Sequence, residues 1–230
     1  MKAYVLAGGL GTRLYPYSLI LPKPLLTLGS KTVIEHILDW ITGYKFDEIT
    51  IAISGRKWAY DLVLKDTYNG IRLKIKSSDK PLGTAGQLKW VAGKEGDTFF
   101  VSYSDSIIKA DLKGAIKKHK ENKAIATVLT AKLKEKLRYG VIDDEKGFLK
   151  RWSEKPEVSY RVAAGAFVFE PDFLKYILGE KYGMNNAVMN AINAGERVLV
   201  YDVESFIDVG NTNSYKKAAY EFAESFGEIP

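Results

Sequence analysis

The sequence predicts an α/β fold in which helices cover both faces of a mostly parallel central sheet. Short β-rich runs alternate with helical patterns from Ala3 to Leu129, which is the strand and helix order of parallel sheets. A glycine-rich loop directly follows the first apolar strand, at the sheet edge where such folds bind ligands. The 230 residues, 46% of them apolar, suffice for one substantial core. We therefore expect residues 1–230 to form a single domain.

The expected strands are short apolar runs. In chain order they are Ala3–Leu6, Ile49–Ile53, Ile71–Lys76, Thr98–Val101 and Ile125–Leu129. Helices are expected between them, near Thr32–Ile41, near Lys57–Tyr68, from Ala85 onward and near Leu112–His119, with a last helix near Tyr215–Phe226. The helix after Thr32 has isoleucine and leucine at helical spacing, and Thr32 with Glu35 fits a capping box.

The pattern changes after Tyr139. Shorter strands are expected there at Val141–Ile142, Phe148–Trp152 and Ala163–Phe169. We expect them to form a small β subdomain that covers one face of the ligand cleft. No repeat or low-complexity tract interrupts the chain.

Composition excludes several classes of site. The net charge is +6, but the 34 basic and 28 acidic residues are interspersed, so a nucleic-acid partner is not expected. There is no cysteine, which excludes disulfides, thiolate zinc sites and a cysteine nucleophile. The two histidines, His36 and His119, lie in helical patterns and are too few for a histidine metal cluster. The N-terminus resembles neither a signal peptide nor a membrane span, so we expect a cytoplasmic protein with no membrane partner.

The glycine-rich loop after the first strand is the most informative segment. It runs on from Leu6 and Ala7 through Gly8, Gly9, Gly11 and Thr12. Glycines let the backbone adopt positive φ and bring its N–H groups close to a ligand, and Arg13 and Lys23 add two cations. The segment contains no P-loop string, Gly-x-x-x-x-Gly-Lys followed by Ser or Thr. It does not match the dinucleotide-binding fingerprint either, because Leu14 stands where the third glycine of that motif belongs. We interpret it as a polyphosphate site.

Two aspartates follow apolar strands. Asp105 comes after Phe99–Val101 between two serines, and Asp208 follows Phe206 and Ile207 and precedes Val209 and Gly210. Mg²⁺ prefers one or two carboxylates together with substrate phosphate oxygens, so the pair would suffice for a magnesium site. Either aspartate by itself is more often a turn-forming or capping residue.

The loop and the lysine resemble the signature of the sugar-phosphate nucleotidylyltransferases. The family pattern has three parts: Gly-x-Gly-Thr-Arg, a later proline, and Pro-Lys-Pro. This chain matches them with Gly9 to Arg13, with Pro16, and with Pro22 to Pro24. The resemblance implies a Rossmann-like (GT-A) domain and assigns roles to the charged residues. Arg13 would contact the β- and γ-phosphates, Lys23 the α-phosphate, and Asp105 and Asp208 would hold Mg²⁺, although Ser104 and Phe206 replace the family's glycine and tryptophan.

Further segments resemble the family's base and sugar loops. Gly83, Thr84 and Ala85 match its base-contacting Leu-Gly-Thr-Ala-Gly loop. Three sugar-side elements of the family are Tyr-Gly-Val, Glu-Lys-Pro and Asn-Ala-Gly. This chain matches them with Tyr139 and Gly140, with Glu154 and Lys155, and with Gly165, and Ala163 stands in place of the asparagine. The β subdomain would therefore be a sugar-side element.

The resemblance implies that a sugar 1-phosphate attacks a nucleoside triphosphate to give a nucleotide-sugar and pyrophosphate. The Gly-Thr-Ala-Gly loop favours mannose 1-phosphate with GTP, and glucose 1-phosphate with UTP, dTTP or CTP is the alternative. A non-catalytic nucleotide-sugar sensor and a nucleic-acid binder are further alternatives, the second of which predicts a steep salt dependence of binding. A homo-oligomer is possible on this sequence.

Overall fold

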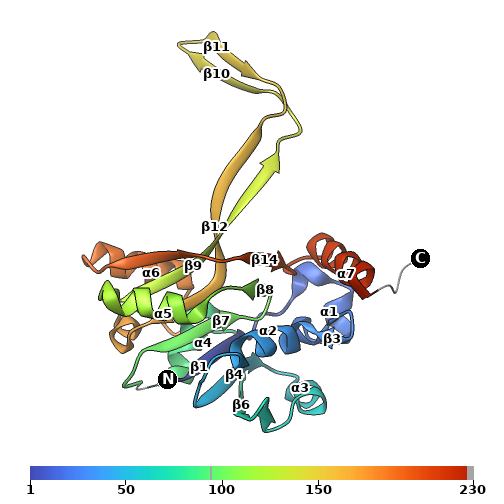
Figure 1. The fold of residues 1–230 in the computed structure, drawn as a ribbon, viewed down its shortest axis with the longest axis vertical. Coiled ribbons are helices and arrows are strands. Elements are labelled where there is room, and N and C mark those ends of the chain that lie inside the picture. The colour runs from blue at the N-terminus through green and yellow to red at the C-terminus, as the bar shows by residue number, and fades with distance from the viewer. Residues whose placement is uncertain (94, 227–230) are drawn as a thin grey trace.

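The computed structural model describes residues 1–93 and 95–226 (Figure 1). Its centre is an eight-stranded sheet in the order β13-β9-β12-β7-β1-β4-β6-β5. Four of its seven neighbouring pairs are parallel and three are antiparallel, so the expected mostly parallel sheet is confirmed. Its strands are β1 (Ala3–Ala7), β4 (Glu48–Ser54), β5 (Thr67–Tyr68), β6 (Ile71–Ser78), β7 (Phe99–Tyr103), β9 (Ala126–Lys136), β12 (Glu157–Phe169) and β13 (Val198–Asp202).

Helices pack on both faces of this sheet, as expected. They are α1 (Tyr17–Ile20), α2 (Val33–Thr42), α3 (Lys57–Val63), α4 (Gly83–Ala92), α5 (Leu112–Glu121), α6 (Met184–Asn193) and α7 (Thr212–Phe226). Alternate side chains of β1 enter two separate cores. Val5 belongs to the core with α2 and α5, and Leu6 to the core with α4 and α6, because successive strand residues point to opposite faces. The predicted capping box of Thr32 and Glu35 begins α2.

Short elements connect these layers. They are the 3-10 helices η1 (Thr12–Leu14), η2 (Lys23–Leu25) and η3 (Pro171–Tyr176), and the strands β2 (Thr27–Leu28), β3 (Lys31–Thr32), β8 (Ser106–Lys109) and β14 (Ser205–Asp208). β14 pairs antiparallel with β8, and Asp208 lies opposite Ser106 in that ladder. This pairing brings the C-terminal part of the chain to the end of β7.

The helix expected over Lys57–Tyr68 is shorter in the structure. α3 ends at Val63, and Thr67–Tyr68 forms β5, which pairs with the start of β6. Asn69 and Gly70 between these strands both have positive φ, as a two-residue hairpin turn requires. The Asn-Gly turn therefore ends the helical pattern earlier than its apolar spacing indicates.

A long two-stranded arm leaves the body of the molecule (Figure 1). It consists of residues 132–162, where β9 and β12 run on together beyond the sheet, and its tip is the hairpin of β10 (Val141–Glu145) and β11 (Phe148–Ser153). We had expected these strands, with Ala163–Phe169, to cover the cleft. Ala163–Phe169 instead belongs to the central sheet. The hairpin points away from the body, and all five β10 residues are therefore exposed.

Among the described helices, none combines the length and the apolar character that a membrane-crossing helix requires.

Candidate nucleotide-binding site

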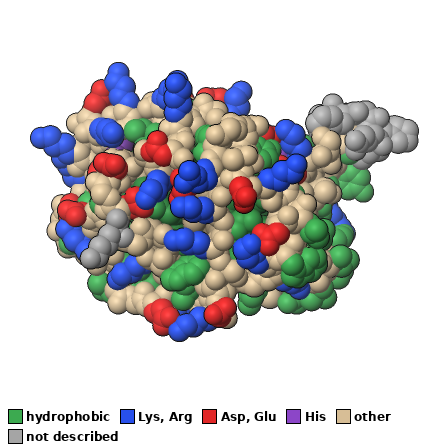
Figure 2. All heavy atoms as spheres, turned by 90° about the horizontal axis from the view of Figure 1, so that it is seen from below, with side chains coloured by type: hydrophobic (Ala, Val, Ile, Leu, Met, Phe, Trp, Pro, Cys, Tyr) green, Lys and Arg blue, Asp and Glu red, His purple; other side chains and the backbone are tan. Residues whose placement is uncertain are grey.

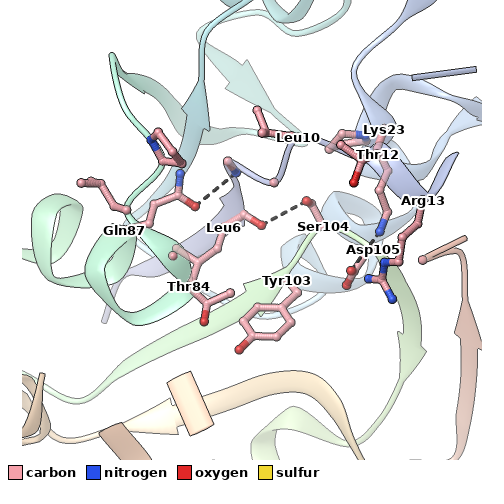
Figure 3. A pocket seen from close by; sticks show the side chains of 18 of the residues that line it. Leu6, Leu10, Thr12, Arg13, Lys23, Thr84, Gln87, Tyr103, Ser104 and Asp105 are labelled. Carbon is pink, nitrogen blue, oxygen red and sulfur yellow. Dashed lines mark hydrogen bonds and ion pairs between the residues drawn. The ribbon is translucent and has the colours of Figure 1, made fainter. Parts of the chain in front are cut away.

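A cavity of about 510 Å³ lies at the carboxyl ends of β1 and β7 (Figure 3). The glycine loop, η2, the start of α4 and the end of β7 form its walls. Its lining residues are Leu6, Gly8, Gly9, Leu10, Gly11, Thr12, Arg13, Lys23, Pro24, Pro81, Leu82, Gly83, Thr84, Gln87, Tyr103, Ser104, Asp105, Lys181 and Gly210. Ligands of open α/β sheets bind at this edge, so the cavity stands where the topology predicts a site.

The glycine loop is held in place by side chains from two other segments. The backbone N–H of Gly8 donates to Oε1 of Gln87 at 3.2 Å, and Oγ of Ser18 donates to the carbonyl oxygen of Gly11 at 2.7 Å. A Cβ on Gly8 would lie 2.0 Å from Nε2 of Gln87, and Gly11 has a φ of +68°. Glycine is therefore required at Gly8 by close approach and at Gly11 by backbone conformation.

The N-terminus of α4 faces the cavity from the opposite wall. Gly83 begins this helix, and a Cβ there would lie 2.6 Å from the carbonyl oxygen of Tyr182. Oγ1 of Thr84 accepts a hydrogen bond from the backbone N–H of Met184 at 2.8 Å. The backbone N–H groups of Ala85 and Gly86 in its first turn donate to the carbonyl oxygen of Tyr182 at 3.0 and 3.2 Å, so the segment before α6 satisfies them and fixes this wall in place.

A lysine and an aspartate meet at the end of the cavity nearest the loop (Figure 3). Nζ of Lys23 lies 2.9 Å from Oδ2 of Asp105, and Arg13 points to the same end. Asp208 is brought close by β14, since the backbone N–H of Val209 donates to the carbonyl oxygen of Asp105 at 3.0 Å. The structure thus gathers two cations and two carboxylates that the sequence had assigned to one site.

Ser104 and Tyr103 shape the wall beside Asp105. Oγ of Ser104 donates to the carbonyl oxygen of Leu6 at 3.0 Å, so the serine that departs from the family's glycine ties the ends of β1 and β7 together. Burial raises the pKa of Tyr103 to about 12, which keeps its phenol neutral. Tyr103 therefore offers a ring and a hydroxyl to a ligand without adding charge.

The two aspartates fit a magnesium ion by the chemistry of their donors. Oδ2 of Asp105 accepts from Lys23, and Oδ1 of Asp208 accepts from the backbone N–H of Gly210 at 2.8 Å. Each carboxylate has a second oxygen, and Mg²⁺ needs only one or two carboxylates when a substrate supplies phosphate oxygens. No group of three or more candidate metal ligands occurs in residues 1–93 and 95–226.

The remaining sequence-predicted residues divide into two groups. Some lie beside the cavity: Ala7 at the end of β1, Ala85 on the buried side of α4, Asp208, and Gly165, whose Cβ position is 3.0 Å from the ring of Tyr103. The others lie on the arm. The Cβ position of Gly140 is 2.9 Å from Oε2 of Glu154 there, and Tyr139 and Lys155 are the chain neighbours of this pair. The structure groups these four with one another and away from the cavity of their own chain.

Several lining residues were missed by the sequence reasoning, among them Gln87, Tyr103 and Lys181. Gln87 follows Gly83 by one helical turn, so helical periodicity could have indicated it. Tyr103 is the last residue of β7, and Asp105 lies beyond that strand, so strand periodicity does not link the two. Lys181 reaches the cavity from the segment before α6, and no local motif marks it.

The sheet, the glycine loop at its edge and the carboxylate pair beside it define an α/β protein with a cavity at the carboxyl ends of its strands. A family model described as Nucleotidyl transferase matches residues 2–225. The chain belongs to this family, which confirms the resemblance recognised in its motifs.

Curated relatives carry more specific names. The chain is 32% identical over 227 residues to mannose-1-phosphate guanyltransferase of Aspergillus fumigatus, covering 94% of this chain and 62% of that protein. It is 33% identical over 226 residues to probable mannose-1-phosphate guanylyltransferase 1 of Oryza sativa, covering 94% and 63%. The chain therefore spans less than two thirds of the length of these relatives.

Solved structures share the fold. HddC from Yersinia pseudotuberculosis superposes with a TM-score of 0.75 at 22% identity, covering 96% of this chain and 99% of that one. A putative glucose-1-phosphate thymidylyltransferase from Bacillus anthracis, in complex with a sucrose, gives 0.75 at 23% identity, covering 96% and 95%. These likenesses confirm the α/β fold.

Proposed function

We propose that this chain transfers the nucleotidyl group of a nucleoside triphosphate to a sugar 1-phosphate and releases pyrophosphate. The observation that carries the proposal is the Lys23–Asp105 ion pair in a cavity walled by the glycine loop and the start of α4. A cation, a carboxylate and converging N–H donors are the groups that phosphoryl chemistry uses. Membership of the nucleotidyl transferase family supports the same reaction.

The chemistry follows from positioning and charge. An oxygen of the sugar phosphate attacks the α-phosphorus, the bond from that phosphorus to the β-bridging oxygen breaks, and pyrophosphate leaves with the bonding electrons. The nucleophile is already an anion, so no general base is required. Lys23 would neutralise the α-phosphate, Arg13 the β- and γ-phosphates, and the loop N–H groups would orient the chain of phosphates. Asp105 and Asp208 would hold Mg²⁺, which would neutralise further phosphate charge when bound.

For the substrate pair we propose GTP and mannose 1-phosphate. The names of the curated relatives support this pair. The name of the Bacillus anthracis structure keeps glucose 1-phosphate with dTTP as the second candidate, and UTP and CTP belong to the same group. The proposal places the reaction in the cytoplasm, in keeping with a sequence that has no cysteine.

The test is pyrophosphate release from a grid of nucleoside triphosphates and hexose 1-phosphates in the presence of Mg²⁺. Asp105→Asn is the inactivating variant, and Asp39→Asn is its matched control, because Asp39 also pairs with a lysine, Lys31, at 2.6 Å but far from the cavity. One dominant pair, lost in Asp105→Asn and kept in Asp39→Asn, is the expected result. Nucleotide-sugar binding without turnover anywhere on the grid would instead identify a sensor.

A further inference from the structure

The arm is rooted at the rim of the cavity. β12 pairs with β7 only from Ala166 onward, so the part of β12 before Ala166 extends past the end of β7, where Tyr103 and Asp105 line the cavity. Gly165 packs against the ring of Tyr103 at this root. The arm therefore begins at the ligand site, although its tip points away from the body (Figure 1).

The arm carries polar groups out of reach of its own cavity. Lys155 precedes Ala163 by eight residues, and strand residues advance about 3.3 Å each, which places Lys155 on the order of 25 Å along the arm. Glu154 accepts a hydrogen bond from Nε1 of Trp152 at 3.1 Å on the same ribbon. These side chains are exposed and lie beside aromatic rings rather than over the cavity from which the arm starts.

The arm also exposes a large apolar surface. Its four large rings, which are between 41% and 80% exposed, are Tyr139, Phe148, Trp152 and Tyr160. With roughly 200 Å² for a whole aromatic side chain, they leave on the order of 500 Å² in water. A two-stranded ribbon without a packed face is marginally stable in water, so we expect this surface to be covered by another chain.

A second apolar surface lies on the body beside the cavity. It is formed by exposed side chains of α1, of the residue after it and of α3, and is called the α1/α3 patch: Leu19, Ile20, Leu21, Trp58, Leu62 and Val63. Nη1 of Arg56 donates to the carbonyl oxygen of Ser18 at 2.9 Å and ties the two helices together. Hydrophobic side chains gather at the right of the face drawn in Figure 2, on the side where α1 and α3 lie in Figure 1.

The α1/α3 patch adjoins the mouth of the cavity. A smaller cavity of about 160 Å³ reaches Arg56 at the start of α3 and shares Gly9, Leu10 and Lys23 with the larger one. Leu10 and Tyr15 are exposed at this junction. A chain docked on the patch would therefore lie next to the phosphate end of the site.

We propose that the arm of each chain docks on the α1/α3 patch of a second copy, so that two chains form a twofold dimer in which each arm closes the partner's cavity. One chain carries both surfaces, and reciprocal pairing covers both in a closed assembly. Two arms and the two patches that they cover would bury on the order of 2,000 Å², at the upper end of the standard interface size of about 1,200–2,000 Å². Glu154 and Lys155 of each chain then reach the cavity of the partner chain.

Association is tested first, without any assay of activity. Sedimentation velocity at micromolar chain concentration should give a particle of twice the 25.7 kDa chain mass. The arm variant Phe148→Asp/Trp152→Asp and the patch variant Ile20→Glu/Leu62→Glu should each be monomeric. Leu178→Glu changes a leucine that is 72% exposed, against 79% for Leu62, and that lies beside α4 outside the α1/α3 patch. This variant should stay dimeric, and thermal melts should show all variants folded.

Mixing the arm variant with the patch variant gives the decisive result. One intact arm and one intact patch remain, so the mixture should form a heterodimer through a single contact. A monomeric wild type would overturn the proposal. A patch variant that remains dimeric would also overturn it, and so would a mixture in which no heterodimer forms. Either result would mean that the arms do not contact the α1/α3 patch.

Closure of the partner's cavity is tested by complementation, and this part rests on the proposed function. The Lys23→Ala variant has an inactive cavity and an intact arm. The arm variant has an intact cavity and an arm that cannot dock. We expect the arm variant alone to lose about tenfold in turnover, and the mixture to recover turnover above that of the two variants measured separately. A dimeric, active wild type without such recovery would overturn closure in the partner. An inactive wild type would contradict the proposed function and leave the association result standing.

Discussion

Lys23 and Asp105 are 82 residues apart in the chain, and Nζ of the lysine donates to Oδ2 of the aspartate at 2.9 Å. The lysine side chain is largely buried, and the pair lies where η2 meets the end of β7. An ion pair fixes the ammonium group in place before any ligand arrives. Asp105 is therefore a positioning residue for Lys23 as well as a candidate metal ligand.

Replacing Lys23 by alanine should lower turnover about 10²-fold or more, because the site loses one preorganised charge that would stabilise the α-phosphate in the transition state. The fold should survive, since the ion pair is one contact at the cavity. Steady-state pyrophosphate release measures the effect, and Lys31→Ala, which breaks the exposed pair with Asp39, is the matched control. Turnover near that of the wild type would remove Lys23 from the mechanism.

Gly8 and Gly9 are neighbours in the loop with opposite tolerance of a side chain. A Cβ on Gly8 would meet Gln87 at 2.0 Å, whereas a Cβ on Gly9 would have no atom within 4 Å. Gly8→Ala should displace Gln87 and lose its hydrogen bond with the Gly8 N–H, at a cost of about 1 to 2 kcal/mol in unfolding free energy. Gly9→Ala should be nearly neutral. Urea unfolding of the two variants distinguishes them, and equal losses would contradict the contact.

The buried His119 should make the protein sensitive to mild acid. Burial lowers the pKa of His119 from 6.5, and the ring is held as a neutral base whose Nε2 donates to Glu170 at 3.1 Å and whose Nδ1 accepts from Thr127 at 2.8 Å. The unfolded chain takes up a proton first, so stability is full above 6.5 and decreases as pH falls below it towards the folded-state pKa.

His119→Gln should flatten that pH dependence while lowering stability at neutral pH. Melting temperatures across the range from pH 8 to pH 5 measure both effects, and His36→Gln, in α2, should keep the wild-type profile because His119 remains. An unchanged slope in His119→Gln would show that another group controls the acid response.

The cavity could be predicted from the sequence because its residues follow strand ends and local motifs. The glycine loop, Lys23 and Asp105 each stand next to a short apolar run, and parallel strands bring their carboxyl ends to one edge. Only the pairing of β14 with β8, which no local pattern encodes, explains why Asp208 joins them.

The arm and α6 could not be predicted in the same way. β10 (Val141–Glu145) and β11 (Phe148–Ser153) do not alternate apolar and polar residues, so the sequence pattern does not mark a face of the hairpin that would pack on the body. α6 buries Ala187 and Ala191 with Met184. Its helical spacing is present, but alanines give a weak apolar signal.

Asp208 provides the last prediction, since its proposed role is separable from that of Asp105. Asp208 contacts Gly210 and is not among the partners of Lys23, so Asp208→Asn should weaken metal binding without releasing the lysine. We expect turnover to require Mg²⁺, to stop on chelation, and to return on addition of Mg²⁺. In Asp208→Asn the Mg²⁺ concentration for half-maximal turnover should rise about tenfold or more, since even groups behind a metal ligand change affinity by about 10- to 100-fold. Glu204→Gln, just before β14 and paired with Lys109 at 3.7 Å, is the matched control. A wild-type Mg²⁺ dependence in Asp208→Asn would leave Asp105 as the sole protein carboxylate of the site and would assign Asp208 to the turn that it makes with Gly210.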